Sequence, residues 1–379
     1  MERGDTALSV VRDALARVAS GAVLDEAAAE AVFAAVMDGQ VTAAQLGALL
    51  MGLRVRGEGE GELVGAARAM RARMRRVPAP DGAVDLCGTG GDGLGTLNVS
   101  TAAAIVVAAA GVPVAKHGGR AVSSRAGAVD VLGALGIAPE EDPERLGAAL
   151  RRRRIAFLAA PAHHPAMRHA APVRAELGVR TLFNLLGPVC NPAGVRRQMV
   201  GVFAAERQEA VARVLHRLGA DGAWVVHGDG LDELGLHGIN RVVVMEGGGL
   251  EAFRFTATEL GLEEQPVAAI AGGDAATNAA AIQRLLAGEP GAYRDTVLLN
   301  AGAALCMAAG RGISEDMVEY GTGPEAGAGI EGGTVAVPPP LDALRRGIAR
   351  AAAAIDGGNA AALLRAVRED ALDGGLAGR

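Results

Sequence analysis

A glycine-rich loop and the start of a helix stand together near residue 90 and could bind phosphate. The run CGTGGDG at 87–93 follows a short apolar stretch, and NVST at 98–101 opens an apolar helix five residues later. Glycines let main-chain amides approach an anion, and a helix N-terminus offers free amides and the positive end of its dipole. Ser100 and Thr101 could add hydroxyl donors or simply cap the helix. The pattern predicts a phosphate site over 88–101.

The same run matches GxGxxG at Gly88, Gly90 and Gly93, so a dinucleotide-binding fold is an alternative. In that fold the helix starts within the glycine motif and an acidic residue follows the next strand. Here residues 94–99 intervene, and the next predicted strand, 112–115, runs into Lys116. A cation at that place favours phosphate over a ribose hydroxyl. A Walker A loop is excluded because the sequence contains no Gly-Lys pair.

A second polar loop, KHGGRAVSS at 116–124, follows that predicted strand. It offers two cations, two hydroxyls and two glycines at a strand end, which is where ligands bind in open α/β sheets. Of the 37 basic residues, Lys116 is the only lysine. A compact ammonium suits a pyrophosphate, and arginine does not replace it freely. We therefore expect Lys116 to bind phosphate.

The elements that would hold these loops fall into two parts. Residues 6–76 show helical spacing of apolar residues, with a capping box at Thr42 and Gln45, and 78–82 is a turn-rich linker. Beyond it, predicted strands alternate with helices, which favours a mainly parallel sheet. The predicted strands are 84–86, 112–115, 155–159, 199–203 and 224–227, followed by a hairpin of 241–245 and 252–255. The predicted helices are 123–135, 163–177, 275–286, 293–309 and 341–368.

The fold class is therefore α/β, with a small N-terminal helical domain and a larger α/β domain whose mainly parallel central sheet is flanked by helices. We place the helical domain at 1–77 and the α/β domain at 83–379. Residues 163–190 are expected to pack on the helical domain, and the Gly- and Pro-rich stretch 312–340 is expected to be an irregular insertion.

Composition narrows the function classes. A net charge of −6 and a pI near 5.7 argue against general nucleic-acid binding, and the basic runs 71–76 and 151–154 are typical of solvated helix faces. Three distant cysteines predict neither a disulfide framework nor a zinc site. Since no apolar stretch of about 18 residues and no leader pattern is present, we expect a soluble, cytoplasmic protein without a membrane span.

Several long motifs in one order make the chain recognisable. They are CGTGGDGLGTLNVST at 87–101, KHGGRAVSSRAGAVDVLGALG at 116–136, HHPAMRHAAPVRAELGVRTLFNLLGPVCNPAG at 163–194, HGDGLDELGLHG at 227–238 and RDTVLLNAGAALCMAAG at 294–310. Together they resemble the anthranilate phosphoribosyltransferases of tryptophan biosynthesis, over nearly the whole chain except 313–340. The resemblance implies transfer of the 5-phosphoribosyl group from 5-phospho-α-D-ribose 1-diphosphate to the amine of anthranilate, with release of pyrophosphate. It also implies a fold shared with pyrimidine nucleoside phosphorylases and a homodimer formed through the N-terminal helices.

The resemblance further implies a role for each matching position. The donor would be bound by Gly88, Gly91, Asp92, Thr96, Asn98, Val99, Ser100, Thr101, Lys116, His117, Gly118, Gly119, Arg120, Ala121, Val122, Ser123, Ser124 and Ala128. The acceptor would be bound by Gly88, His117, Gly119, His164 and Arg174, and magnesium by Ser100, Asp232 and Glu233.

The chemistry of these residue types agrees with those roles. Adjacent carboxylates such as Asp232 and Glu233 are hard oxygen ligands suited to Mg²⁺, although a solvated acidic turn is the alternative. The planar fork of Arg174 fits a carboxylate, although a helix surface would suit it equally. His117 is a candidate general base, and orientation of the acceptor is an equal alternative. His163 and His164 could line the acceptor pocket or pack in the core.

Two positions depart from the family within its best motif. The family usually has KHGNR, and Gly119 stands in the place of that asparagine; Ala128 stands where a serine is common. Donor chemistry is therefore expected to be preserved, while the acceptor is open. The alternatives are a paralogue that uses another aromatic amine or nitrogen base, a nucleoside phosphorylase, and a nucleic-acid-binding relative that uses 71–76 and 151–154. The acidic pI and the intact Asp232–Glu233 pair argue against the last.

Overall fold

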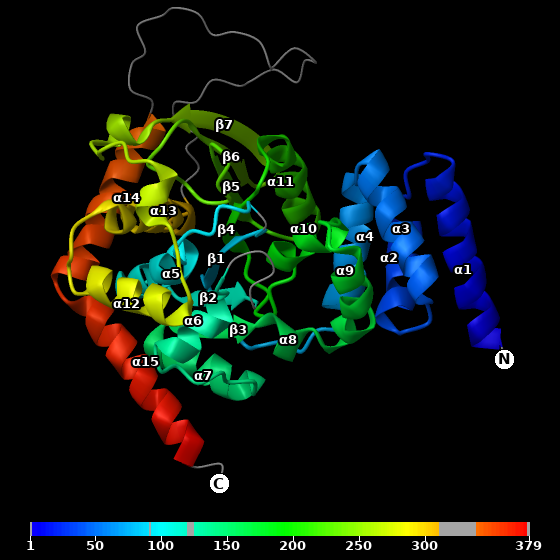
Figure 1. Cartoon of the computed structure of the whole chain (residues 1–379), viewed down its shortest axis with the longest axis horizontal. Helices are drawn as coiled ribbons and strands as arrows, with labels where there is room; N and C mark the ends of the chain where they lie inside the picture. The colour runs from blue at the N-terminus through cyan, green and yellow to red at the C-terminus, as the bar shows by residue number, and fades with distance from the viewer. Residues whose placement is uncertain (1, 91, 120–124, 311–338, 377–379) are drawn as a thin grey trace, which may run out of the picture.

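The computed structural model describes residues 2–90, 92–119, 125–310 and 339–376 (Figure 1). A bundle of N-terminal helices stands beside a larger α/β unit, which confirms the predicted fold class. The helices of the bundle are α1 (Glu2–Ala19), α2 (Glu26–Met37), α3 (Ala43–Arg56) and α4 (Glu60–Arg71). They close around Phe33, Leu49 and Leu53, which are fully buried. The predicted capping box starts α3, since the main-chain amide of Thr42 donates to Gln45 Oε1 (3.0 Å) and that of Gln45 to Thr42 Oγ1 (3.3 Å).

The sheet has seven strands in the order β3-β2-β1-β4-β5-β6-β7. The strands are β1 (Val84–Gly88), β2 (Val114–Gly118), β3 (Ile155–Ala159), β4 (Arg197–Gly201), β5 (Gly222–Gly228), β6 (Asn240–Glu246) and β7 (Gly249–Phe255). Strands β1 to β5 pair in parallel, and β6 and β7 form the predicted hairpin, antiparallel to β5 and to each other. The carboxyl ends of β1, β2, β4 and β5 therefore meet at one edge, and each of these strands ends in glycine.

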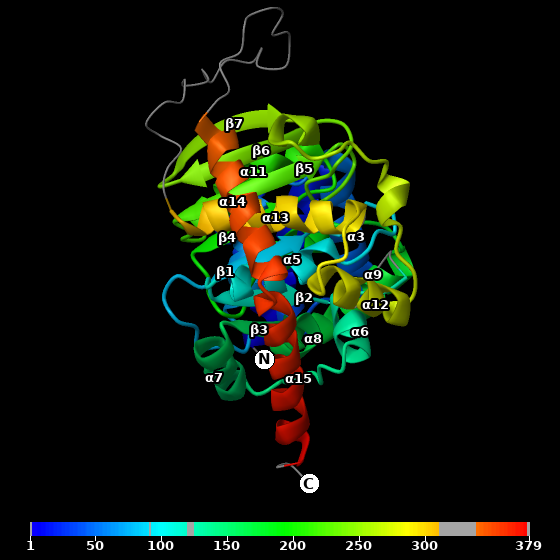
Figure 2. The same cartoon turned by 90° about the vertical axis from the view of Figure 1, so that its left-hand side faces the viewer.

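Helices cover both faces of the sheet because alternate strand residues point to opposite sides. Trp224 and Val226 belong to one core, and Val225 belongs to the other. The first face is covered by α5 (Val99–Ala109), α6 (Ala128–Ala134), α12 (Ala275–Leu286), α13 (Ala292–Ala308), α14 (Pro339–Asp356) and α15 (Asn359–Leu376), several of which face the viewer in Figure 2. The second is covered by α10 (Leu182–Val189), α11 (Gln208–Arg217) and the bundle, which share one continuous core. Helix α7 (Pro143–Arg153) packs beside β3.

A further group of short helices links β3 to the bundle. They are α8 (Ala160–His163), η1 (Pro165–His169) and α9 (Ala171–Leu177), and the remaining 3₁₀ turns are η2 (Ala205–Arg207), η3 (Ala257–Leu260) and η4 (Val267–Ile270). Helix α9 contacts α3, and α10 contacts α3 and α4. The bundle therefore supports the segment 163–190.

Three expected helices differ in the structure. The stretch 163–177 is broken at His164 and Ala170, where proline follows each break and removes a main-chain donor. The helix expected from 123 begins at Ala128, and residues 120–124 lie outside the described residues. The stretch 341–368 is two helices, because Gly358 turns the chain with φ +74°. Most of the expected insertion 312–340 also lies outside the described residues.

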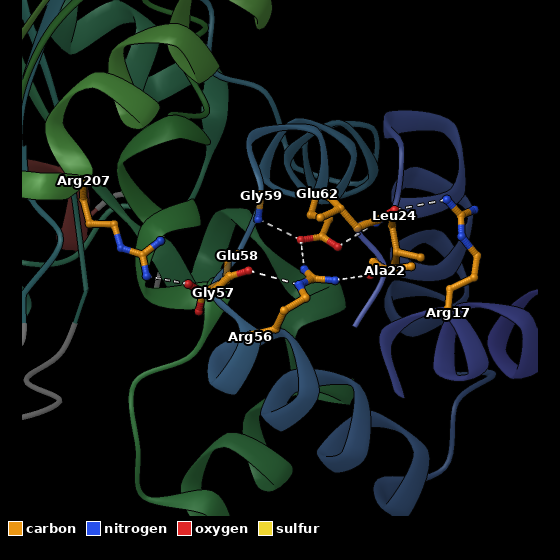
Figure 3. A network of polar contacts seen from close by, with 10 residues as sticks. Arg17, Ala22, Leu24, Arg56, Gly57, Glu58, Gly59, Glu62 and Arg207 are labelled. Atoms are coloured by element: carbon orange, nitrogen blue, oxygen red, sulfur yellow. Dashed lines mark hydrogen bonds and ion pairs between the residues drawn. The ribbon is translucent and has the colours of Figure 1, made fainter. Parts of the chain in front are cut away.

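Ion pairs join the bundle to the α/β unit (Figure 3). Glu58, in the loop between α3 and α4, pairs with Arg207 just before α11 (2.9 Å). Beside it the buried carboxylate of Glu62 accepts from the main-chain amides of Leu24 (2.9 Å) and Gly59 (2.8 Å) and pairs with Arg56. The Glu58–Arg207 pair thus joins the bundle to the α/β unit, and the contacts of Glu62 hold the bundle together from within.

In the described part of the chain, no helix combines the length and the apolar character needed to cross a bilayer.

Candidate active site

A cavity of about 650 Å³ opens at the carboxyl ends of the parallel strands. Its walls come from the loop after β1, the first turn of α5, the end of β2, the segment 160–188 and the loop after β5. Strand β1 lies between β2 and β4, so the strand order reverses at this point. Ligands of open α/β sheets bind at such a reversal.

The predicted site residues that the structure describes all line this cavity. They are Gly88, Asp92, Thr96, Asn98, Val99, Ser100, Thr101, Lys116, His117, Gly118, Gly119, Ala128, His164, Arg174, Asp232 and Glu233. Gly91, Arg120, Ala121, Val122, Ser123 and Ser124 lie outside the described residues. Segments far apart in the sequence therefore meet at one site.

The helix after the glycine-rich loop is not capped by its own N-cap residue. Asn98 occupies the N-cap position of α5 but makes no capping bond, and its Oδ1 instead accepts from Asn278 Nδ2 (2.9 Å). The alternative that Ser100 or Thr101 caps the helix is therefore wrong, because both lie inside it. Although Asn98 makes no capping bond, one amide at this helix start is already taken, because the main-chain amide of Ser100 donates to Glu233 Oε1 (3.1 Å).

Lys116 and His117 lie within β2, not in the loop after it, because they continue the pairing with Phe157 and Leu158 of β3. Neighbouring strand residues point to opposite faces. Lys116 is only 4% exposed, and its ammonium donates to the carbonyl oxygen of His117 (3.0 Å). No ion pair in the described ranges includes it, although the charges of Asp85 and Glu233 are close enough to act on it. A buried ammonium of this kind can neutralise a phosphate.

Two histidines form the wall beside Lys116. His117 Nδ1 donates to the carbonyl oxygen of Gly187 (3.1 Å), which leaves Nε2 buried and without a partner among the described residues. Its ring meets that of His164 edge to face, with 5.1 Å between centroids. Burial lowers the pKa of His117 well below its ordinary value and that of His164 to about 4. Both rings are therefore neutral near pH 7. His163 does not line the cavity; its Nδ1 bonds the carbonyl oxygen of Arg75 (3.1 Å).

The acidic pair lies in the loop after β5. Asp232 Oδ2 accepts from the main-chain amide of Gly90 (2.6 Å), and Glu233 Oε1 accepts from that of Ser100 (3.1 Å). Asp232 is buried and Glu233 is partly buried, and desolvation raises the pKa of each carboxyl. The charge of Asp92 raises the pKa of Asp232 further, and that of Asp232 raises the pKa of Glu233. A cation would relieve this repulsion. Among the described residues no three His, Cys, Asp or Glu side chains form a metal cluster, so the donor set is an open pair.

Two strand-end glycines make room for this acidic loop. A Cβ on Gly201, at the end of β4, would lie 1.6 Å from the carbonyl oxygen of Asp232. A Cβ on Gly88, at the end of β1, would lie 2.2 Å from Asp232 Oδ2. Any side chain at either position would push Asp232 out of place.

Arg174 faces the cavity from α9. Its guanidinium stands over the ring of Phe183, with 5.3 Å from Cζ to the centroid. No ion pair in the part of the chain that the structure describes includes Arg174, and burial lowers its pKa. A partly buried guanidinium without a counter-ion can bind a carboxylate.

Some residues that shape the site were missed from the sequence. Asp85 is fully buried in β1 and accepts from the main-chain amide of His117 (3.1 Å) and from Asn191 Nδ2 (2.7 Å), so it supports the end of β2. Asn240 and Asn300 are fully buried beside the acidic loop. In the sequence, such residues could have been noticed as single polar residues within an apolar strand or helix, as in VDLC at 84–87 and LLNAGAAL at 298–305.

Comparisons with known proteins agree along the chain. A family model described as the helical bundle domain of a glycosyl transferase family matches residues 12–74, and one for the a/b domain of that family matches residues 80–322. Anthranilate phosphoribosyltransferase of Paramagnetospirillum magneticum is 56% identical over 309 residues, which are 81% of this chain and 89% of that protein. That of Gluconobacter oxydans is 52% identical over 362 residues, 94% of either chain.

Solved structures match as well. The crystal structure of anthranilate phosphoribosyltransferase from Thermus thermophilus has a TM-score of 0.82 and 42% identity, and the match covers 94% of this chain and 98% of that one. The enzyme from Saccharomyces cerevisiae in complex with PRPP and Mg has a TM-score of 0.78 and 25% identity, and the match covers 97% and 98%.

Proposed function

Because the chain belongs to the glycosyl transferase family, among the anthranilate phosphoribosyltransferases, we propose that its cavity binds a phosphoribosyl donor against the sheet and anthranilate against α9. The enzyme transfers the 5-phosphoribosyl group of 5-phospho-α-D-ribose 1-diphosphate to the amine of anthranilate and releases pyrophosphate, the second step of tryptophan synthesis from chorismate. The assignment of residues rests on one observation. One cavity is lined by Lys116, by the start of α5 and by the carboxylates of Asp232 and Glu233, and Arg174 lines it from α9.

The donor side neutralises charge that grows on the leaving pyrophosphate. Lys116 supplies a fixed positive charge in a poorly solvated place, where electrostatic stabilisation is strongest. The loop after β1 and the first turn of α5 add main-chain donors. The site therefore stabilises the departing group mainly by fixed charges and dipoles.

Magnesium fits the acidic pair. Desolvation and neighbouring carboxylates raise the pKa of Asp232 and Glu233, with Asp92 acting on Asp232 and Asp232 acting on Glu233. Ser100 lies beside them with its amide on Glu233. A donor set of two carboxylates is typical of Mg²⁺ that also contacts substrate phosphates. When bound, Mg²⁺ would add positive charge next to the diphosphate. The yeast relative in complex with PRPP and Mg supports this assignment.

The acceptor side holds anthranilate by its carboxylate and its amine. Arg174 would bind the carboxylate, and His117, which also lines the cavity, would face the amine. A ring whose pKa is far below 7 is a weak base, so we assign His117 to orientation of the amine rather than to removal of its proton. His164 supports that ring from the side.

The residue at position 119 bears on which acceptor the enzyme uses. The family usually has an asparagine at this position, and this chain has Gly119 instead. A Cβ at Gly119 would meet no described atom within 4 Å. A paralogous transfer to another aromatic amine or nitrogen base is the alternative that this feature favours.

A direct assay separates these two acceptors. Purified protein is mixed with 5-phospho-α-D-ribose 1-diphosphate, Mg²⁺ and anthranilate, and the loss of anthranilate fluorescence is followed. We expect turnover that requires all three components. Donor binding without turnover would refute anthranilate as the acceptor and leave the paralogous transfer.

Organisation beyond the site follows from the same family. We propose a helical domain at 1–77 and an α/β domain at 83–379, and a homodimer formed through the N-terminal helices, where Val55 of α3 is 81% exposed. We also propose that the enzyme works in the cytoplasm.

A further inference from the structure

Two buried asparagines bind the main chain directly after the acidic pair. Asn300 of α13 accepts from the main-chain amide of Leu234 (3.0 Å) and donates to the carbonyl oxygen of Leu234 (2.8 Å) and to that of Thr296 (2.9 Å). Asn240 of β6 accepts from the main-chain amide of Gly235 (2.8 Å) and donates to its carbonyl oxygen (2.9 Å). Each amide thus satisfies both main-chain groups of one residue, which only a side chain with a donor and an acceptor can do.

The loop is also fixed before the acidic pair. His227, in β5, donates from Nδ1 to the carbonyl oxygen of Val202 (2.9 Å), and its Nε2 accepts from the main-chain amide of Gly230 (3.1 Å). Both contacts fit a single tautomer of the ring. The carboxylates of Asp232 and Glu233 therefore lie in a short segment held at both ends.

Asn300 has no contact of its own with the cavity. No residue of the motif at 294–310 lines it, and the neighbours of Asn300 on α13 are buried apolar residues. A polar side chain is costly in such a helix unless its hydrogen bonds are made. Asn300 makes them mainly to Leu234, next to Glu233.

We propose that Asn300, together with Asn240, is a positioning residue that holds Asp232 and Glu233 in the geometry needed to bind Mg²⁺ with the diphosphate. The inference rests on the proposed magnesium site. The adjacent carboxylates of Asp232 and Glu233 repel each other, and a free loop would let them move apart. Fixing the main chain behind them removes that relaxation, so less free energy is lost when the cation binds. A residue that only stabilised the fold would not change the metal requirement.

The test compares Asn300→Leu with Gln208→Leu. Gln208 is also a buried amide that binds the main chain twice, through Nε2 to the carbonyl oxygens of Val225 (2.7 Å) and Arg241 (2.9 Å), but from α11 on the other face of the sheet. Three quantities are measured on the full chain. They are the Mg²⁺ concentration for half-maximal rate, KM for anthranilate, and the rise in Tm when Mg²⁺ and 5-phospho-α-D-ribose 1-diphosphate are added together.

We expect Asn300→Leu to raise the Mg²⁺ requirement about tenfold or more, in the range found for residues that orient metal ligands, and to reduce the rise in Tm. KM for anthranilate should change little, and Gln208→Leu should lower Tm alone. The proposal is overturned if Asn300→Leu behaves like Gln208→Leu in all three quantities. If Asn300→Leu does not fold, Asn300→Asp, which keeps the acceptor for Leu234 and loses the donor, decides by the same criteria.

Failure of the metal assignment has a different pattern. The double variant Asp232→Asn, Glu233→Gln should lose the Mg²⁺-dependent rise in Tm. If it keeps the wild-type rise, magnesium binds elsewhere, and Asn300 then has no metal ligands to position.

Discussion

Replacement of Arg174 should weaken binding of the acceptor and leave the donor almost unaffected. The guanidinium is partly buried above Phe183, and no ion pair among the described residues includes it. A carboxylate that reaches it gains charge-assisted hydrogen bonds worth roughly 1.5–3 kcal/mol, which corresponds to about 10- to 100-fold in affinity. Arg174→Ala should therefore raise KM for anthranilate by about that factor. The KM of Arg174→Lys should lie between those of the wild type and Arg174→Ala, because lysine keeps the charge but loses the planar fork.

The measurement follows anthranilate fluorescence while each substrate is varied at saturating levels of the other. Arg168→Ala is the matched control, because Arg168 also lines the cavity but its guanidinium is bonded to the main chain, to the carbonyl oxygen of Pro165 (3.2 Å). The reasoning is refuted if KM for the donor rises as much as KM for anthranilate, or if Arg168→Ala has the same effect as Arg174→Ala.

Two further predictions concern Lys116 and His164. Lys116→Ala should raise KM for the donor by at least about tenfold, since it removes a charge-assisted contact, with a much smaller change for anthranilate in initial-rate measurements; equal changes would contradict the assignment. The pKa of His164 is about 4 in the folded chain against an ordinary value of 6.5, so only the unfolded chain gains the proton between these values and stability falls as pH falls from 6.5 towards 4. Between pH 7 and pH 5 this loss is about 2 kcal/mol, and urea unfolding of His164→Gln should show a smaller loss than wild type.

Local patterns were sufficient to predict the phosphate loop and the general fold. The glycine run and the helix start at 98–101 are neighbours in sequence, so their joint role is visible without a structure. The alternation of strands and helices likewise predicts a parallel sheet. The hairpin at its end is also a local pattern, because its two strands are consecutive in the sequence.

Features that depend on distant contacts were not predictable. Lys116 lies in β2 because β3 extends the pairing by Phe157 and Leu158, which no local pattern around Lys116 reveals. The supporting roles of Asp85 and Asn300 depend on hydrogen bonds to residues 32 and 66 positions away. In the sequence each is only a polar residue in an apolar run, which signals that it has a partner but not which one.

The single lysine has a practical consequence for labelling. Reagents that acylate amines can modify only the chain's terminal amine and Lys116, whose side chain lines the cavity. The mass of the treated protein therefore reports on one ammonium inside the site. A diphosphate bound over Lys116 would shield it, so the yield of the second modification would fall as the donor is added, and a plain titration by mass spectrometry would measure occupancy of the cavity without any turnover.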